Sequence, residues 1–145
     1  MATMLENARR MMAGELPPPA FPSYIGMKLT ALEPGRARME MTTDARHTNP
    51  MGTVHGGVPS TLADSAMGLA YASTLGEGES FTTLELKINF LRPVWSTTLI
   101  AEGVVVQRGR TIGLAECSVT DGNGRLIARA SSTCMTLRDE EAAGR

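Results

Sequence analysis

The chain reads NPMGTVHGGVPSTLADSAMGLAY from Asn49 to Tyr71, and this run contains its only long helical pattern. Between Val58 and Ser73 almost every residue is small or apolar, so the predicted helix has no polar face and belongs inside the fold. Asp64 is the single charged residue of that helix. An unpartnered carboxylate is costly to remove from water, so its presence there calls for a functional explanation.

The predicted helix starts at His55, Gly56 and Gly57. The two glycines lack Cβ atoms, so a ligand can approach the backbone N–H groups that the first helical turn leaves unpaired. These groups and the positive end of the helix dipole favour an oxygen that carries negative charge. The carbonyl oxygen of a thioester develops such a charge when a nucleophile attacks its carbon.

Asp64 lies eight residues after Gly56 in the sequence, which corresponds to about 12 Å along a helix. A nucleophile or base and an oxyanion donor must both lie within about 3–3.5 Å of the reacting atoms. The two residues of one helix therefore cannot serve one carbonyl. Two such helices, antiparallel across a twofold axis, could bring Gly56 of one chain opposite Asp64 of the other. The spacing predicts a homodimer whose site is shared between subunits.

Outside this helix the chain is dominated by strand patterns. Alternating side chains and turn residues predict strands at residues 27–33, 36–42, 82–91, 97–107, 111–120 and 125–137. In the strand at 82–91, the alternating apolar residues from Leu84 to Phe90 are expected to face the core. One apolar helix is buried most efficiently by a curled antiparallel sheet of five or six strands wrapped around it, which is an α+β fold. The edge strands of such a sheet again favour pairing with a second copy.

The predicted domain spans residues 26–137. Residues 1–25 are expected to form a short amphipathic helix at 1–14 and a Pro-rich extended linker, after which Phe21, Tyr24 and Ile25 return to the domain. Residues 138–145 are a charged tail that we expect to be disordered.

Composition excludes several classes of function. The 145 residues carry a formal net charge of -1, which indicates no nucleic-acid partner. The two cysteines and the histidines have no metal-ligand spacing, so no metal site is predicted. No run of about 18 apolar residues and no signal-peptide core occurs, which predicts a cytoplasmic protein without a membrane partner.

Residues 49–57 and 62–68, NPMGTVHGG and LADSAMG, resemble the active-site loop and central helix of the hotdog-fold acyl-CoA thioesterases. The likeness continues through residues 82–93, TTLELKINFLRP, and is strongest to the PaaI type, which includes phenylacetate-pathway and 4-hydroxybenzoyl-CoA thioesterases. The resemblance implies a hotdog fold and hydrolysis of an acyl-CoA thioester to a carboxylic acid and coenzyme A. It implies no cofactor, because coenzyme A is part of the substrate. It also implies dimers that pair into tetramers.

The resemblance also assigns roles to single residues. Asp64 would attack the thioester carbonyl as a nucleophile or activate water as a general base, and the sequence leaves both open. The backbone N–H of Gly56 would polarise the carbonyl. His55 and Asn49 would contact the substrate or hold the loop, and Thr83 would touch the catalytic water or carboxylate. Each also has a structural interpretation, as a loop histidine, a turn asparagine or an ordinary strand threonine.

Gly57 would give the substrate access to the helix start, and the coenzyme A phosphates would need cationic partners. Arg92, Arg108 and Arg110 are the candidates, although arginines in turns are often merely solvated. For the acyl group we expect a pocket lined by some of five residues, namely Met51, Met67, Tyr71, Phe90 and Trp95. Aromatic residues make up only 4% of the chain, and aryl, medium-chain and branched acyl groups all remain open.

Two alternative functions remain at this stage. One is a hotdog-fold hydratase or dehydratase that moves protons at carbon with a histidine and an acid, which would have to be His55 and Asp64. The other is a non-catalytic acyl-CoA-binding protein. The chain carries no basic DNA-recognition helix and has little room for an output domain, which weighs against a sensor.

Overall fold

The computed structural model describes residues 1–144. Three helices and six strands occur, and short 3₁₀ turns follow β2 and β6. The helices are α1 (Met4–Met12), α2 (Ala20–Ile25) and α3 (Gly57–Ala72). The strands are β1 (Lys28–Glu33), β2 (Arg36–Thr42), β3 (Ser80–Phe90), β4 (Thr98–Arg108), β5 (Ile112–Asp121) and β6 (Leu126–Leu137).

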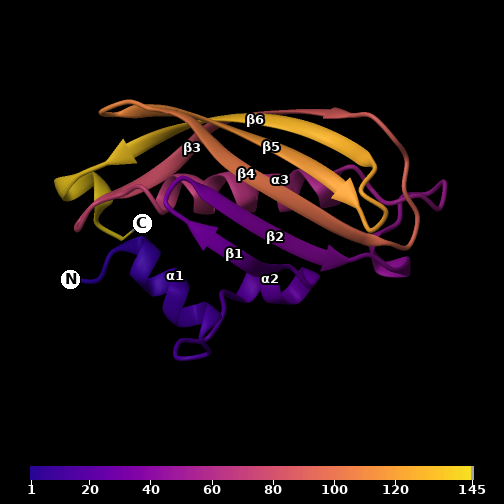
Figure 1. The fold of residues 1–145 in the computed structure, drawn as a ribbon, viewed down its shortest axis with the longest axis horizontal. Helices are drawn as coiled ribbons and strands as arrows, with labels where there is room; N and C mark the ends of the chain where they lie inside the picture. The colour runs from indigo at the N-terminus through magenta and orange to yellow at the C-terminus, as the bar shows by residue number, and fades with distance from the viewer. Residues whose placement is uncertain (145) are drawn as a thin grey trace.

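The six strands form one antiparallel sheet in the order β1-β2-β4-β5-β6-β3, which curls around α3 (Figure 1). The predicted α+β architecture of a curled sheet around one central helix is therefore confirmed. Strands β4, β5 and β6 pair in chain order as a meander, while β3 crosses over to pair with β6 and becomes an edge of the sheet.

One face of α3 is completely buried against the concave side of the sheet. It carries Leu62, Ala63, Ala66, Met67, Ala70 and Tyr71, which have no solvent exposure. Glycines on the sheet let the helix approach closely: a Cβ added at Gly103 of β4 would lie 2.5 Å from the backbone carbonyl oxygen of Ala66. The small-residue pattern of the helix is thus matched by small residues on the strands.

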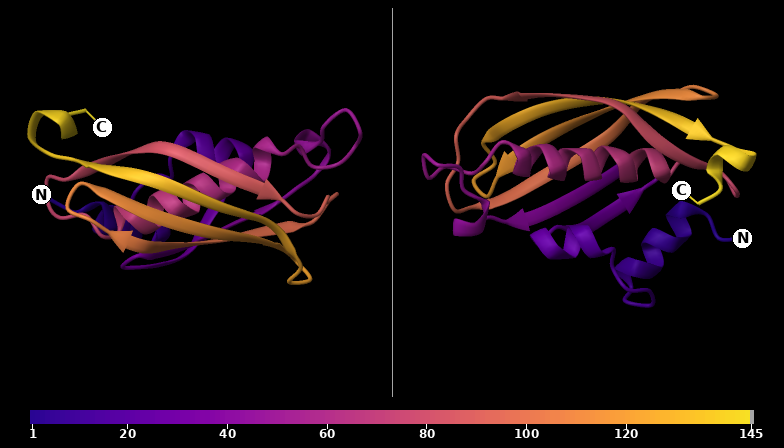
Figure 2. Two further views of the ribbon diagram at one scale, coloured as in Figure 1. Left: turned by 90° about the horizontal axis from the view of Figure 1, so that it is seen from above. Right: turned by 180° about the vertical axis from the view of Figure 1, so that it is seen from behind.

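The N-terminal helices lie on the other side of α3, below the opening of the curled sheet (Figure 2). Helix α1 starts with a capping box, in which Thr3 accepts a hydrogen bond from the Glu6 N–H and the Glu6 carboxylate accepts one from the Thr3 N–H. Helix α3 is therefore covered on two sides, by the sheet and by this N-terminal layer.

Residues 20–25, which follow the predicted Pro-rich linker, form the helix α2, which the sequence pattern did not predict. Gly26 ends this helix in the left-handed conformation, with φ of 85°. Ile25 packs against the core, but Phe21 and Tyr24 are 59% and 83% exposed and do not return to the domain as predicted.

The predicted inward face of β3 is only partly buried. Leu86 and Ile88 pack on the core, whereas Leu84 and Phe90 are 53% and 55% exposed. A bulge between Thr83 and Glu85 breaks the alternation, so Leu84 turns outward. Strand β3 is also an edge, which leaves one side of its backbone without a partner in the single chain.

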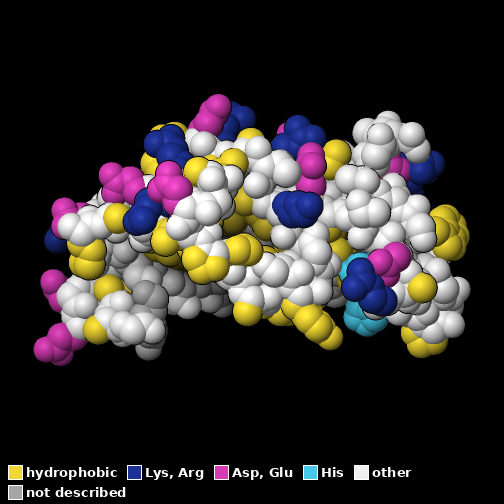
Figure 3. All heavy atoms as spheres, turned by 90° about the horizontal axis from the view of Figure 1, so that it is seen from below, with side chains coloured by type: hydrophobic (Ala, Val, Ile, Leu, Met, Phe, Trp, Pro, Cys, Tyr) yellow, Lys and Arg dark blue, Asp and Glu magenta, His cyan; other side chains and the backbone are white. Residues whose placement is uncertain are grey.

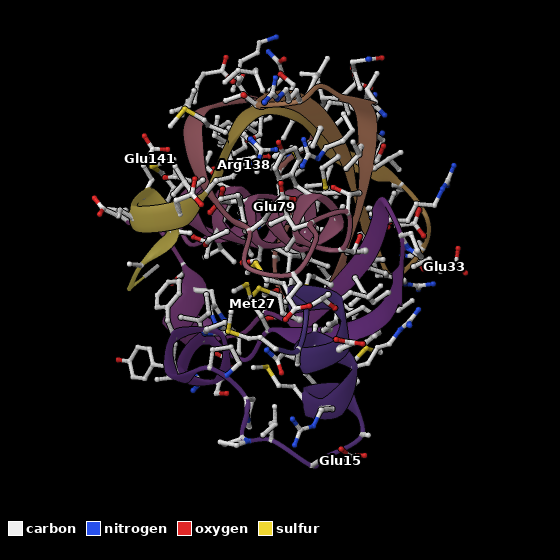
Figure 4. All side chains as sticks on the ribbon, turned by 90° about the vertical axis from the view of Figure 1, so that its left-hand side faces the viewer. Glu15, Met27, Glu33, Glu79, Arg138 and Glu141 are labelled. Carbon is white, nitrogen blue, oxygen red and sulfur yellow. The ribbon has the colours of Figure 1, made fainter. Side chains whose placement is uncertain are left out.

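The disordered tail at residues 138–145 stays a prediction, and Arg145 lies outside the described residues. Arg138 donates to the Glu79 carboxylate and to the Arg110 carbonyl oxygen, and Figure 4 shows Arg138 and Glu79 close together at this end of the molecule. A 3₁₀ turn follows at Asp139–Ala142. The sequence pattern did not reveal Glu79 as a partner of Arg138.

Candidate functional site

The N-terminus of α3 presents one free backbone donor. Gly57 donates its N–H to Nδ1 of His55 at 2.9 Å, the Val58 N–H bonds to the His55 carbonyl, and Pro59 has no N–H. The Gly56 N–H has no acceptor within residues 1–144. Gly56 is therefore the position at which this helix start can receive an external oxygen.

The loop before α3 is held by Asn49 rather than left flexible. The Asn49 side-chain oxygen accepts from the N–H groups of Met51 and Thr53, and its amide donates to the Thr53 hydroxyl at 2.7 Å. The His55 N–H donates to the carbonyl oxygen of His47, a buried residue whose Nε2 lies 3.3 Å from the Ile25 carbonyl. Asn49 therefore holds the loop through these hydrogen bonds. His47, which the sequence analysis did not single out, supports the same loop through its carbonyl oxygen.

Asp64 stands on the face of α3 that points away from the sheet. It lines a cavity of about 620 Å³ between α3 and the N-terminal helices. Although the carboxylate is solvent-accessible in the single chain, the walls around it desolvate it and raise its pKa above the ordinary value. No cation within residues 1–144 offsets this rise. A carboxylate of this kind is a stronger base than a solvated one.

This cavity, which we call the methionine chamber, is lined by residues of α1, α2, β1, β2, α3 and β3. Five methionines contribute to its wall: Met4, Met11, Met12, Met27 and Met39. Figure 4 shows Met27 between α3 and the N-terminal helices. None of the five residues expected to line the acyl pocket reaches the chamber. Met67 and Tyr71 are buried against the sheet, while Met51, Phe90 and Trp95 are exposed elsewhere.

Thr83 lies on β3 in the wall of the same chamber as Asp64. It is paired with Cys134 of β6, immediately before the bulge. Burial raises the pKa of the Cys134 thiol, hydrogen bonds from Ser132 and Thr83 oppose that rise, and the negative charge of Asp64 adds to it. The raised pKa makes the thiol a poor nucleophile.

Gly56 opens into a different cavity, of about 410 Å³, whose wall includes Phe90 and Arg92. The Phe90 ring covers the glycine so closely that a Cβ at position 56 would lie 3.0 Å from its nearest ring carbon. In the single chain, therefore, Gly56 and Asp64 belong to separate cavities. Arg92 lines the cavity of Gly56, and Thr83 lines the cavity of Asp64.

Arg108 and Arg110 lie near the other end of α3. The Arg108 guanidinium stacks over the Tyr71 ring at 5.0 Å, donates to the Thr74 hydroxyl and pairs with Glu79. The Arg110 carbonyl oxygen accepts from Arg138. These contacts give Arg108 a structural role at the C-terminal end of the helix and separate both arginines from the cavity at Gly56.

The sequence matches the family model described as the Thioesterase superfamily over residues 51–128, which is more than half of the chain. The chain belongs to the Thioesterase superfamily. A protein of Saccharolobus solfataricus, named as a candidate esterase, is 35% identical over 115 residues, which cover 79% of this chain and 81% of that protein. Acyl-coenzyme A thioesterase 13 of Mus musculus is 27% identical over 136 residues, and the match covers 92% of this chain and 96% of that protein.

Solved structures agree with this assignment. A phenylacetic acid degradation-related protein from Ralstonia eutropha is 30% identical with a TM-score of 0.81, and the match covers 88% of this chain and 98% of that one. The predicted resemblance to PaaI-like thioesterases and the hotdog fold are confirmed. The prediction that the protein is an enzyme that hydrolyses thioesters is confirmed by the thioesterase family to which the chain belongs.

Within residues 1–144 no group of three or more His, Cys, Asp or Glu side chains is arranged to hold a metal ion. None of the helices in that part of the chain is long and apolar enough to cross a membrane.

Proposed function

We propose that this thioesterase hydrolyses acyl-CoA thioesters, with Asp64 of one subunit and the Gly56 N–H of another acting on the same carbonyl. The observation that carries the proposal is their arrangement on α3. Asp64 is the desolvated acid of the helix, Gly56 holds its free donor, and the two open into separate cavities. Only a second copy of the helix can bring the two groups together.

The edge strand β3 offers the surface for this association. Leu84, Phe90 and Leu91 are exposed along or just beyond it, and one side of its backbone lacks a partner in the single chain. Pairing two β3 edges around a twofold axis would cover these side chains and continue the sheet from one subunit into the other. A dimer of dimers would need a further apolar surface, and the outer face of β4 and β5 carries exposed Val106, Ile112 and Leu114.

In this arrangement the thioester carbonyl oxygen accepts a hydrogen bond from Gly56. The Asp64 carboxylate either attacks the carbonyl carbon directly or takes a proton from a water that does so. The negative charge that develops on the oxygen is stabilised by the Gly56 N–H and the dipole of its helix. Collapse of the intermediate breaks the carbon–sulfur bond, and the departing thiolate takes up a proton. After direct attack, the acyl group stays on Asp64 as a mixed anhydride that one water then hydrolyses; after attack by water, the carboxylic acid forms in the same step, and Asp64 passes the proton of that water to the thiolate.

The surrounding residues support these two groups. The His55 ring accepts the Gly57 N–H, so the first turn presents the Gly56 donor alone. Asn49 holds the loop that leads to it. Thr83, in the chamber wall with Asp64, is suited to hold a water or the carboxylate. Arg92 is the proposed partner for a coenzyme A phosphate, because it lies in the cavity that contains Gly56.

Release of free thiol from octanoyl-CoA and phenylacetyl-CoA tests the proposal. The Asp64→Asn variant should lose about 10²–10⁴-fold in kcat, because the amide can neither attack nor accept a proton. Its sedimentation should match that of the wild type, since the amide has the shape of the carboxylate. Equal rates for wild type and variant would show that Asp64 is structural. A wild type that binds both substrates but releases no thiol would overturn the assignment as an acyl-CoA hydrolase.

A further inference from the structure

The methionine chamber runs along one face of α3. The helix contributes Asp64, Ser65, Gly68, Leu69 and Ala72 to its wall, a spacing that marks a single stripe. Asp64 and Thr83 are in the wall at one position along this stripe, while Met4 of α1 packs against the cluster that contains Ala72. From Asp64 to Ala72 the helix advances about 12 Å. The chamber therefore extends away from the proposed reaction centre, underneath the N-terminal helices.

The side chains that line the chamber indicate which kind of ligand it would hold. Most lining residues are apolar, and the methionines come mainly from α1 and the start of β1. Figure 3 shows hydrophobic side chains across the middle of the face on which the N-terminal helices lie. Methionine side chains are unbranched and adapt to irregular, flexible ligands. Phe81 is the single aromatic residue among the lining residues, so the wall offers no pair of rings to sandwich an aryl group.

The size of the chamber limits the length of its ligand. An extended chain of single bonds advances about 1.2 Å per bond, as the spacing of about 3.6 Å for the three bonds of a residue shows. A path of about 12 Å along α3 then holds about ten bonds. The volume of about 620 Å³ lies within the range of ligand pockets in proteins.

We propose that the methionine chamber is the acyl site, that it selects a flexible aliphatic acyl chain of about eight to twelve carbons, and that α1 sets the length limit. This inference rests on the proposed function, because it takes Asp64 as the group that acts on the thioester. It adds the substrate class and assigns the chain-length limit to Ala8, Met11 and Met12, which no catalytic argument uses.

Ala8 provides the sharpest test. It is 7% exposed, lies in the middle of α1 and lines the chamber, so a leucine there adds three carbons to the interior. Leucine also preserves the helix. Ala13 is a matched control, because it follows the same helix, is exposed and does not line the chamber. Ala8→Leu and Ala13→Leu therefore differ in whether the added group enters the chamber.

We would measure kcat/KM for butanoyl-, octanoyl-, dodecanoyl- and phenylacetyl-CoA. For the wild type the value should rise from butanoyl to octanoyl by up to about fourfold per methylene, and octanoyl should exceed phenylacetyl. Ala8→Leu should lower the dodecanoyl value at least about 15-fold, the effect of losing two buried methylenes, and leave the butanoyl value within about twofold. Ala13→Leu should follow the wild type throughout.

Binding of the non-hydrolysable thioethers butyl-CoA and dodecyl-CoA, measured by calorimetry, separates this inference from the proposed function. If the wild type hydrolyses acyl-CoAs but Ala8→Leu changes all chain lengths equally or not at all, the chamber is not the acyl site, although the thioesterase assignment holds. If no acyl-CoA is hydrolysed, the proposed function fails, and dodecyl-CoA binding that Ala8→Leu weakens would still support the chamber. A change of oligomeric state in Ala8→Leu, without a change in chain-length preference, would make the chamber a contact between subunits and overturn the inference.

Discussion

The start of α3 leaves one N–H group free, and the proposed chemistry depends on it. Gly57 donates to His55, Pro59 has no hydrogen, and Gly56 alone remains. Its φ of -57° is close to the angle that proline requires. A proline at this position can therefore remove the N–H without reversing the local backbone.

We expect Gly56→Pro to lower kcat by about 10²–10³-fold, the usual cost of losing one oxyanion donor. Gly56→Ala is the matched control, because it adds a Cβ at the same place but keeps the N–H. Since that Cβ meets only the far end of the Phe90 ring, a small rotation of the ring can accommodate it. Stopped-flow thiol release would compare the two variants. Equal losses in both would mean that steric contact with Phe90, rather than the donor, matters.

The raised pKa of Asp64 also affects the stability of the folded chain. Desolvation raises its pKa in the folded chain, so the folded state holds the proton more tightly than the unfolded state. Between the unfolded value, ordinarily 3.8, and the raised folded value, stability therefore falls as pH rises. Above both values the ionised carboxylate is a destabilising group.

Asp64→Asn should consequently raise the midpoint of thermal unfolding at pH 7 and lose this advantage at a pH below 3.8, where the wild-type residue is protonated in both states. Calorimetric scans of both proteins across this range would check the sign. A variant that is less stable than the wild type at pH 7 would mean that the carboxylate has a stabilising partner in the assembled protein.

At the scale of single elements, the spacing of apolar residues explains which helices and strands could be predicted from the sequence. Helix α3 and all six strands lie within two residues of their predicted bounds, since each carries a clear apolar pattern. The start of β3 and its bulge did not follow from alternation, because a bulge adds one residue without changing composition. Helix α2 was missed because a Pro-rich segment favours extended structure and its six residues carry no helical period.

The candidate site likewise has features that the sequence could reveal and features that it could not. Asp64 and Gly56 could be singled out from sequence because each is unusual for its helical position. The methionine chamber could not, because it needs α1, α2, β1 and β3 to meet in space. The stripe of α1 that includes Met4, Ala8 and Met11 indicated a packed helix, but not that its packing leaves a cavity.

The close contact between α3 and β4 leads to a prediction about the stability of the fold. A side chain at Gly103 would meet the backbone of Ala66, which cannot rotate away as a side chain can. Gly103→Ala should therefore destabilise the fold by about 1–3 kcal/mol through a forced shift of the helix. Gly122→Ala is the control, because its nearest neighbour would be the Thr97 hydroxyl oxygen at 3.8 Å. Urea unfolding measures both, and equal midpoints would show that the helix moves freely on the sheet.

At the scale of the whole molecule, Asp64 and Gly56 of the single chain face different cavities, and the β3 edge has no partner in that chain. The twofold dimer proposed above would supply the missing half of each site and the missing strand together. The central claim of the proposal is that every site uses Asp64 from one chain and Gly56 from the other, and no single-subunit measurement can test it.

Mixed dimers test this claim most directly. Asp64→Asn and Gly56→Pro chains, coexpressed with different affinity tags and purified on both, should form a dimer with one intact site and about half of the wild-type activity. A dimer of a wild-type chain with a chain that carries both substitutions is the reciprocal control and should be inactive. If the first dimer is as inactive as its parents while the second keeps half of the activity, each site lies within one chain and the account is contradicted.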